Sequence, residues 1–292
     1  MKISLNCAHT DAERRAALFE GDLLLYSGMP ALAELALHAK RCISEAFGEE
    51  PETAQFRMPV AEFAATAGPL KSRFTNDNTT KELVRGVLVG FGCDLDETYF
   101  DVPRLRVVTS NGYLTAGVGY AYKAHRDTWY SSPDCQVNWW APVFALTEER
   151  SLAFYPGVWA RPVANSSGDF DYDEWCRVGR AVAGSQVTVD TRNHPLPLEP
   201  LPADAEMRLT IGAGDLVLFS GAHLHATVPN GSGLTRFSFD FRTVNAEDIR
   251  LGAGAPNVDC RATGTTLGDF IRASDFSPVP AGWCERAVRR AA

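Results

Sequence analysis

The sequence lacks the features that mark several large classes of protein. It contains no run approaching the ~18 consecutive apolar residues of a membrane-spanning helix. Its 28 Lys and Arg residues are outnumbered by 36 Asp and Glu residues, and the formal net charge of −8 argues against a basic surface for nucleic acid or anionic lipid. The first residues reach Asp11 and Glu13 without a long apolar segment, so no secretory signal is expected. We therefore predict a cytoplasmic protein without nucleic-acid or membrane partners.

The cysteines are scattered along the chain without regular spacing. The 7 cysteines are odd in number and none forms a CxxC pair, so the sequence predicts neither a disulfide framework nor a cysteine-ligated zinc site. Reduced thiols are the expected state, and they agree with a cytoplasmic location.

What remains is the composition of an ordinary globular protein. Hydrophobic residues make up 45% of the 292 positions and charged residues 22%, which is enough apolar material for one large core. No repeat or linker divides the chain, so we expect a single domain over residues 1–292. Its expected parts are a mostly helical segment over 1–100 that packs on the β core, the core itself over 101–245, and a C-terminal extension over 246–292.

The first hundred residues show helical periodicity. Apolar residues at helical spacing follow Pro30, and Gly48 ends the pattern, so a helix is predicted between them. Two more helices are predicted to begin near Pro59 and near Asn78. A short apolar run over 22–26 predicts one strand before the first of these helices.

From about residue 101 onward, apolar and polar residues alternate as they do in strands with one buried face. Many short strands beside a helical segment favour a mainly β fold with flanking helices, arranged as a sandwich or barrel. The polar stretch over 165–171 is typical of a surface loop or lid. Strands are predicted over 104–108, 136–140, 152–155, 186–189, 215–219 and 236–242, with turns rich in Gly, Pro and Asn between them.

A candidate metal site begins with His125, which stands two residues before Asp127 in a chain that has only 6 histidines. In an extended segment these two side chains point to the same side, so both can bind one ion. A third ligand is expected after the apolar strand over 215–219, where His223 and His225 share one side of the chain. Two imidazoles and a carboxylate on one face are the ligand set of non-haem iron(II) oxygenases.

A candidate anion site lies on the last long alternating strand, where Arg236 and Arg242 share a face with Ser238 and Asp240. A guanidinium directed into a barrel is costly to bury unless a carboxylate meets it. Its parallel N–H groups match a carboxylate in bidentate fashion, so a dicarboxylic cosubstrate suits it. On the strand pattern alone, Arg236 and Arg242 are rival candidates for this anion site.

In combination these motifs resemble the iron(II)- and 2-oxoglutarate-dependent oxygenases, and within them the phytanoyl-CoA dioxygenase-like branch. The resemblance implies a double-stranded β-helix, that is, a cupin-like jelly roll, as the core. The matching segments are 125–127, 149–157, 214–219 and 225–230, followed by Arg236.

The resemblance also implies roles for individual residues. It makes His125, Asp127 and His225 the iron(II) ligands and the catalytic centre. It makes Arg236 the anchor of 2-oxoglutarate, with the Thr227 hydroxyl beside it, and O2 the second cosubstrate.

Other residues near these motifs are weaker candidates. Gln136 and Asn138 share one face of the strand after Asp127, where they can bind the cosubstrate, orient an iron ligand, or simply satisfy backbone groups. The candidate substrate contacts are Arg104, Arg126, Trp129 and Trp140.

The function predicted from the sequence is a non-haem iron(II)- and 2-oxoglutarate-dependent dioxygenase. It is expected to hydroxylate, desaturate or cyclise a free small molecule, an amino-acid-like compound or a secondary metabolite, and to release succinate and CO2. Two alternatives stay open: a jelly-roll metalloenzyme that uses no 2-oxoglutarate, and a non-catalytic barrel that binds a ligand. The sequence indicates no oligomeric state.

Overall fold

The computed structural model describes residues 1–179, 182–202 and 206–285, and its centre is a pair of β-sheets. The large sheet has 8 strands, in the order β1-β2-β8-β5-β10-β3-β11, with β4 also paired to β10. The small sheet has 3 strands, in the order β7-β6-β9. All pairs are antiparallel except β1 with β2. The strands are β1 (Ile3–Leu5), β2 (Leu23–Tyr26), β3 (Thr98–Asp101), β4 (Arg104–Val108), β5 (Val137–Pro142), β6 (Leu152–Phe154), β7 (Met207–Leu209), β8 (Leu216–Ser220), β9 (His225–Thr227), β10 (Arg236–Asn245) and β11 (Phe270–Arg272).

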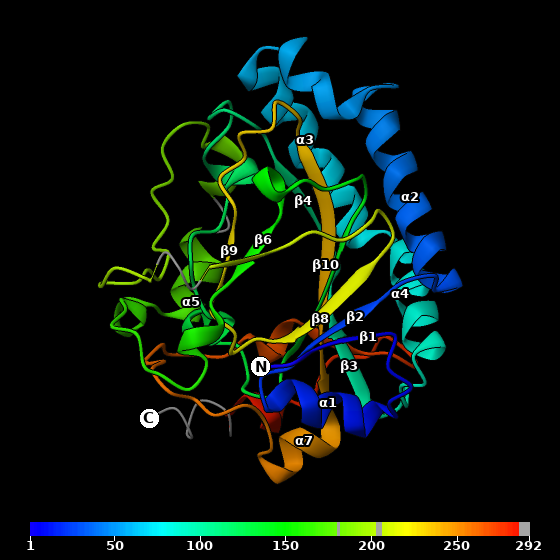
Figure 1. Ribbon diagram of the computed structural model, residues 1–292, viewed down its shortest axis with the longest axis vertical. Helices are drawn as coiled ribbons and strands as arrows, with labels where there is room; N and C mark the ends of the chain where they lie inside the picture. The colour runs from blue at the N-terminus through cyan, green and yellow to red at the C-terminus, as the bar shows by residue number, and fades with distance from the viewer. Residues whose placement is uncertain (180–181, 203–205, 286–292) are drawn as a thin grey trace.

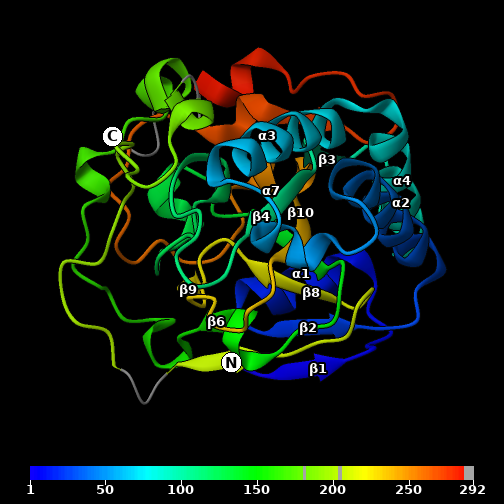
Figure 2. The same ribbon diagram turned by 90° about the horizontal axis from the view of Figure 1, so that it is seen from above.

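Helices cover the large sheet on the side opposite the small sheet (Figure 1). Figure 2 shows the same layering from above, with α2, α3 and α4 outside the large sheet and β6 and β9 across from it. Among the described residues, no helix has both the length and the apolar character needed to cross a bilayer. The helices are α1 (Asp11–Phe19), α2 (Pro30–Phe47), α3 (Val60–Asn76), α4 (Asn78–Gly90), α5 (Tyr172–Glu174) and α7 (Ala246–Leu251).

The three helices predicted from the sequence form where local signals place their ends. Pro30 occupies the first turn of α2, where its missing N–H costs nothing, and Gly48 ends the helix with φ +86°, a conformation that favours glycine. The Asp77 side chain accepts a hydrogen bond from the Thr79 N–H and so caps α4. Helix α3 begins after Pro59. The prediction of these helices is confirmed.

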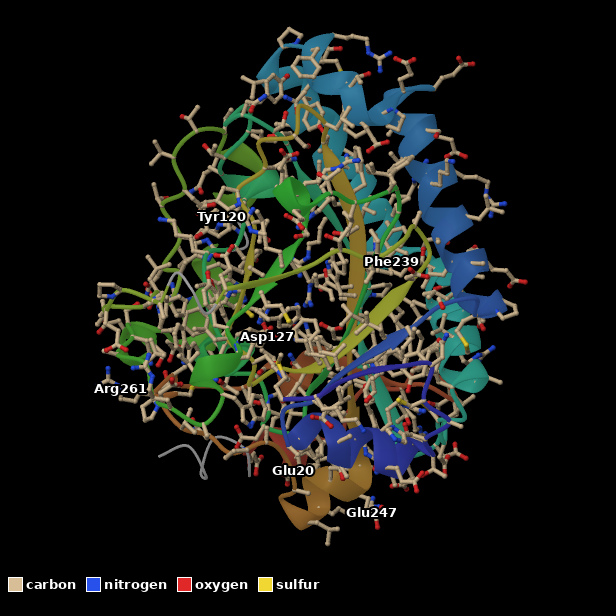
Figure 3. All side chains as sticks on the ribbon, viewed as in Figure 1. Glu20, Tyr120, Asp127, Phe239, Glu247 and Arg261 are labelled. Carbon is tan, nitrogen blue, oxygen red and sulfur yellow. The ribbon has the colours of Figure 1, made fainter. Side chains whose placement is uncertain are left out.

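Strand β10 separates the helix-packed core from the interior between the sheets. Its Phe237, Phe239 and Phe241 are buried against the helices, within the main hydrophobic cluster. The residues between them in sequence point to the other face, because side chains alternate along a strand. Figure 3 shows Phe239 on the helix side of β10 and Asp127 on the side of the small sheet.

The predicted strand over 186–189 is wrong. The Val187 carbonyl accepts hydrogen bonds from the N–H groups of Thr115 and Ala116, and the Gln186 side chain bonds to Thr191, so local polar contacts hold this segment as an irregular loop. The other five predicted strands over 101–245 correspond to β4, β5, β6, β8 and β10.

Strands from outside residues 101–245, near both ends of the chain, extend the large sheet. β1 and β2 join it beside β8, and β11 joins it beside β3. Two facing sheets with helices packed outside are the expected class, mainly β with flanking helices around a jelly-roll core, and that expectation is confirmed.

Candidate metal centre and its cavity

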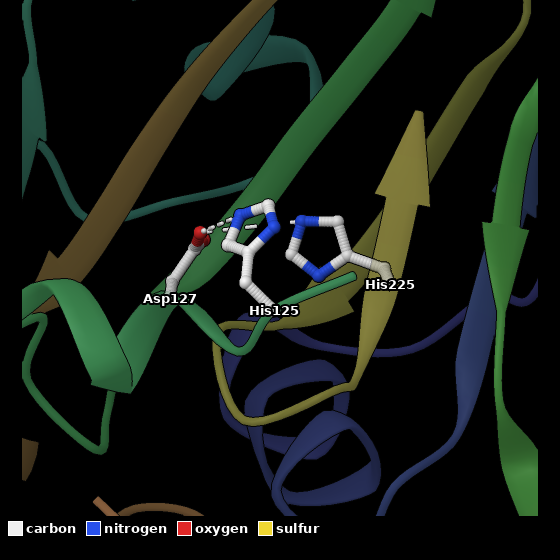
Figure 4. A group of neighbouring side chains, drawn as sticks. All are labelled: His125, Asp127 and His225. Atoms are coloured by element: carbon white, nitrogen blue, oxygen red, sulfur yellow. Dashed lines mark ion pairs between the residues drawn. The ribbon is translucent and has the colours of Figure 1, made fainter. Parts of the chain in front are cut away.

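His125, Asp127 and His225 come together between the two sheets (Figure 4). One ligand atom from each lies within 4.8 Å of the others. The Asp127 Oδ1 atom is 3.4 Å from His125 Nε2 and 4.0 Å from His225 Nε2. Among the described residues this is the one group of three or more His, Cys, Asp or Glu side chains with such spacing.

Backbone pairing brings the two histidines side by side. His125 and His225 form an isolated antiparallel bridge, each donating its N–H to the carbonyl of the other at 3.0 Å. Directly paired residues in an antiparallel ladder project to the same face, and the ring centroids are accordingly 4.4 Å apart. Arg126 is extended, with φ −100° and ψ 144°, so Asp127 returns to the side of His125 as the two-residue spacing predicts.

Backbone carbonyls orient both imidazoles. His125 Nδ1 lies 2.7 Å from the Lys123 carbonyl, and His225 Nδ1 lies 2.9 Å from the His223 carbonyl. A carbonyl only accepts hydrogen bonds, so each Nδ1 carries the proton and each Nε2 keeps its lone pair for a metal. Burial, and then the neighbouring His125, lowers the pKa of His225 to about 4, which keeps this ring neutral at pH 7.

The Asp127 carboxylate is held by one oxygen and free at the other. Its Oδ2 accepts hydrogen bonds from Asn138 Nδ2 at 2.6 Å and from Gln136 Nε2 at 3.0 Å, which leaves Oδ1 toward the imidazoles. Burial by itself raises the pKa of Asp127, but its contacts with His125 and His225 and the charge of Arg242 outweigh it and hold the pKa well below its usual range.

This donor set fits iron(II). Two neutral imidazoles and one ionised carboxylate converge from one side, and the cavity on the other side leaves positions for further ligands. The hydrogen bonds behind each ligand are the kind that fix tautomer and ring orientation in metal sites.

His223, the rival of His225 in the sequence, lies outside the cluster. Its Nε2 is 3.1 Å from the Gly21 carbonyl and its Nδ1 is 3.2 Å from the Ser220 carbonyl. The ring packs on Trp159 with centroids 4.4 Å apart. Both of its nitrogens therefore face backbone oxygens of the neighbouring segments.

A cavity of about 370 Å³ opens beside the three residues. A volume of this size suits a small molecule. Its lining includes His125, Asp127 and His225, the even-numbered residues Arg236, Asp240 and Arg242 of β10, and aromatic side chains such as Tyr120, Tyr122, Tyr130, Trp140 and Trp175.

Arg236 presents a buried guanidinium to this cavity. Its NH1 donates to the Ser151 carbonyl at 2.9 Å and its NH2 to Thr227 Oγ1 at 3.5 Å, while Nε is buried without a hydrogen-bond partner. None of the carboxylates that the structure describes forms an ion pair with it. Burial, and then the nearby Arg106, lowers its pKa to about 9. An anion arriving in the cavity would relieve this cost.

Arg242, the rival of Arg236, already has its partners. Its NH1 lies 3.2 Å from Asp101 Oδ2 and its NH2 lies 3.7 Å from Asp240 Oδ2. Arg242 is thus paired with carboxylates, whereas Arg236 has no such partner among the described residues. The sequence pattern does not reveal this difference.

The four predicted substrate contacts divide into two pairs. Arg104 and Trp140 line the cavity. Arg126 and Trp129 do not line it, which corrects their predicted placement: both are buried and bond to Asp259, through Arg126 Nε at 3.1 Å and Trp129 Nε1 at 2.7 Å. Arg126 lies between two inward residues and therefore points away from them.

Several cavity residues were not singled out from the sequence. Lys71 comes from α3, and Arg192 comes from the irregular segment after residue 185. Nothing in the spacing of these residues connects them with the metal motifs. Tyr172 and Trp175, which follow the segment predicted as a surface loop or lid, also line the cavity.

Comparisons with known proteins bear on the fold. No family model matches the chain, and no curated protein matches it in sequence. The solved structures that resemble it include EvdO2 from Micromonospora carbonacea var. aurantiaca complexed with 2-oxoglutarate, at 11% identity and a TM-score of 0.48, with 82% of this chain and 92% of that chain covered.

Two further solved structures resemble the chain at a similar distance. The non-heme α-ketoglutarate-dependent epimerase SnoN from nogalamycin biosynthesis has 15% identity and a TM-score of 0.41, over 80% of this chain and 83% of that one. EctD from S. alaskensis with bound Fe has 14% identity and a TM-score of 0.40, over 82% and 78%. Since the likenesses are this distant, the function proposed below rests on the residues of the site.

Proposed function

We propose that this protein is a non-haem iron(II)- and 2-oxoglutarate-dependent oxygenase that acts on a small molecule. One observation carries the proposal: a cluster of two neutral imidazoles and a carboxylate opens on the same cavity as a buried guanidinium without a carboxylate partner among the described residues. The first feature suits a metal with open positions, and the second suits a dicarboxylic cosubstrate.

In this proposal His125, Asp127 and His225 hold iron(II). Together with 2-oxoglutarate and O2, the metal supplies the oxidation of an unactivated C–H bond, with release of succinate and CO2. Arg236 and the Thr227 hydroxyl hold the carboxylate of 2-oxoglutarate that lies away from the metal. The amides of Gln136 and Asn138 bind Asp127 and so act as positioning groups.

The protein also shields the reaction from water. Tyr122 and Tyr130 stand against His125, with ring centroids 5.5 and 5.2 Å from its ring. Trp140 lies under the Arg236 guanidinium, with Cζ 5.7 Å from the ring centroid. A cavity walled by aromatic rings excludes water around a reactive centre and strengthens the electrostatic contacts inside it.

The proposal is tested by anaerobic titration of the apoprotein with iron(II) and then 2-oxoglutarate, followed in the visible spectrum. We expect iron(II) to bind and 2-oxoglutarate to add a weak metal-to-ligand charge-transfer band. His225→Ala should lose iron binding, and Arg236→Leu should keep iron but lose the band at moderate 2-oxoglutarate concentrations. His223→Asn is the matched control and should keep both.

The two alternative functions predict different results. Iron binding without any band would favour a metalloenzyme of this fold that does not use 2-oxoglutarate. Failure of iron(II) and other divalent metals to bind would favour a non-catalytic barrel.

A further inference from the structure

The charges that line the cavity are not balanced. Most of the cationic side chains that line it have a carboxylate partner in the structure. One of them is assigned to 2-oxoglutarate in the proposed function, and one has neither a partner nor an assigned ligand. The cationic side chains are Lys71, Arg104, Arg106, Arg192, Arg236 and Arg242. Their pairing indicates what else the cavity binds.

Four of these cations form ion pairs with neighbouring carboxylates, and two of the four share Asp101. Arg106 makes a bidentate pair with Asp240, through Nε at 2.5 Å and NH2 at 2.9 Å. Arg192 Nε donates to Asp190 at 2.8 Å. Arg104 pairs with Asp101, as does Arg242 at 3.2 Å. Arg236, the fifth, is the anchor assigned to 2-oxoglutarate above.

Lys71 is the sixth cation and lacks such a partner. Its Nζ donates to the Val118 carbonyl at 2.5 Å, and no carboxylate of the described residues forms an ion pair with it. An ammonium has three donors, so two remain after this bond. Burial, and then the charges of Arg106 and Arg192, lowers the pKa of Lys71 to about 7, which marks an ammonium that is poorly compensated.

We propose that the substrate carries an anionic group, a carboxylate or a phosphate, which binds Lys71 in the cavity. The proposal rests on the proposed function, because it takes Arg236 to be occupied by 2-oxoglutarate and assigns the remaining unpaired cation to the substrate. A half-buried lysine that lacks a carboxylate partner gains most from a ligand that supplies one.

The surroundings of Lys71 limit the size of this substrate. The Tyr122 ring lies between the cationic end of the cavity and the metal ligands: its centroid is 5.3 Å from the Arg106 Cζ and 5.5 Å from the His125 ring. An anionic group at Lys71 and a reacting carbon near the metal ligands would belong to one compact molecule, because these residues line the same cavity of about 370 Å³. Tyr120 and Trp175 supply apolar surface for its body, and Arg192 Cζ lies 5.5 and 5.4 Å from their ring centroids.

The test is a binding titration of the full-length protein with phenylacetate, phenyl phosphate and the neutral phenylacetamide, followed by tryptophan fluorescence, since Trp140 and Trp175 line the cavity. We expect at least one anion to bind about tenfold or more tightly than the amide, as a charge-assisted hydrogen bond requires. The two anions distinguish a carboxylate site from a phosphate site.

Variants locate the binding. Lys71→Met should weaken the preferred anion about tenfold or more and leave the amide unchanged, whereas Lys71→Arg should retain the preference. Lys81→Met on α4, outside the cavity, is the matched control. Arg236→Leu should keep anion binding, because the proposed site is Lys71.

Several results would overturn the proposal: equal binding of anions and amide, no saturable binding of either anion, or loss of anion binding in the Arg236 variant rather than in Lys71→Met. The titration contains neither iron nor 2-oxoglutarate. Its failure is therefore distinguishable from failure of the proposed function, which the metal titration reports separately.

Discussion

Asn138 reaches from β5 to the Asp127 carboxylate and donates a 2.6 Å hydrogen bond to its Oδ2 atom. The bond fixes the carboxylate so that Oδ1 faces the two imidazoles. Asn138 is itself held, since its Oδ1 accepts a hydrogen bond from Gln136 at 3.0 Å. A strand of the large sheet therefore controls the orientation of a ligand that begins the short 3-10 helix Asp127–Tyr130.

Removing this support should weaken the metal site. We expect Asn138→Ala to reduce iron(II) affinity about 10- to 100-fold, the usual effect of losing a hydrogen bond behind a metal ligand. Anaerobic titration with iron(II) and a competing chelator measures it. Asn76→Ala, at the exposed end of α3, is the control and should leave affinity unchanged. Equal affinities for wild type and Asn138→Ala would show that Asp127 needs no such support.

The Thr227 hydroxyl should matter for 2-oxoglutarate and not for the metal. It lies 3.5 Å from Arg236 NH2, and β9 carries it two residues after His225. Thr227→Val keeps the shape and removes the hydroxyl, so we expect the affinity for 2-oxoglutarate to fall by up to about tenfold. The charge-transfer titration gives this affinity, and the iron(II) titration serves as its internal control. A change in iron affinity of similar size would argue for a general disturbance of β9.

Much of the fold follows from local sequence signals. The helix between Pro30 and Gly48 has its periodicity and both end signals in the sequence itself. The segment over 186–189 shows the limit of such signals. Its four alternating residues predict a strand, but side-chain and backbone hydrogen bonds hold it as an irregular loop.

The candidate site is only partly visible in the sequence. The two-residue spacing of His125 and Asp127 predicts that their side chains point to the same side, because side chains alternate in extended backbone. The choice between His223 and His225 depends on which one pairs with His125, a contact across 100 residues of chain. The place of Lys71 in the cavity depends still more on the tertiary structure, since α3 brings it there from another part of the chain.

His194 should make the protein sensitive to mild acid. Burial, and then Arg192, lowers its pKa from 6.5 to about 4, so the unfolded state binds a proton at pH values where the folded state does not. Stability is therefore lost as the pH falls from 6.5 toward 4, on the order of 3 kcal/mol for this group. Urea unfolding at about pH 7 and pH 4.5 should show a smaller loss in His194→Gln than in wild type.

Tyr130→Phe separates the titration of His194 from the loss of its local contacts. It removes the 2.9 Å hydrogen bond to His194 Nδ1 and keeps the imidazole. We expect similar destabilisation at both pH values, of about 1 kcal/mol. An acid loss in His194→Gln as large as that of wild type would assign the pH dependence to other groups.

Phe239 should be one of the costliest core positions. Its ring is fully buried on the helix side of β10, where it faces Phe74 of α3 with centroids 6.4 Å apart. Phe239→Ala should lower the free energy of unfolding by about 3–5 kcal/mol, and Phe239→Leu by much less. Leu37→Ala, at a side chain that is 54% exposed, should change it by less than about 0.5 kcal/mol. Comparable losses at the two positions would contradict the layering described above.

Anion binding at Lys71 should depend on pH in a defined direction. Burial and the neighbouring Arg106 and Arg192 hold the pKa of the free protein's Lys71 at about 7, against the opposing effect of Asp240. A lysine binds an anion as the ammonium, so phenylacetate affinity should fall as the pH rises above about 7, approaching tenfold for each further unit.

The matched variant for this dependence is Lys71→Arg, because a guanidinium stays charged throughout the range. Fluorescence titrations at about pH 6 and pH 8.5 should show a large loss of phenylacetate affinity in wild type and little change in the variant. The same loss in both proteins would place the titrating group elsewhere in the cavity. A flat wild-type profile would mean that Lys71 stays protonated across the range, with a pKa close to that of an exposed lysine.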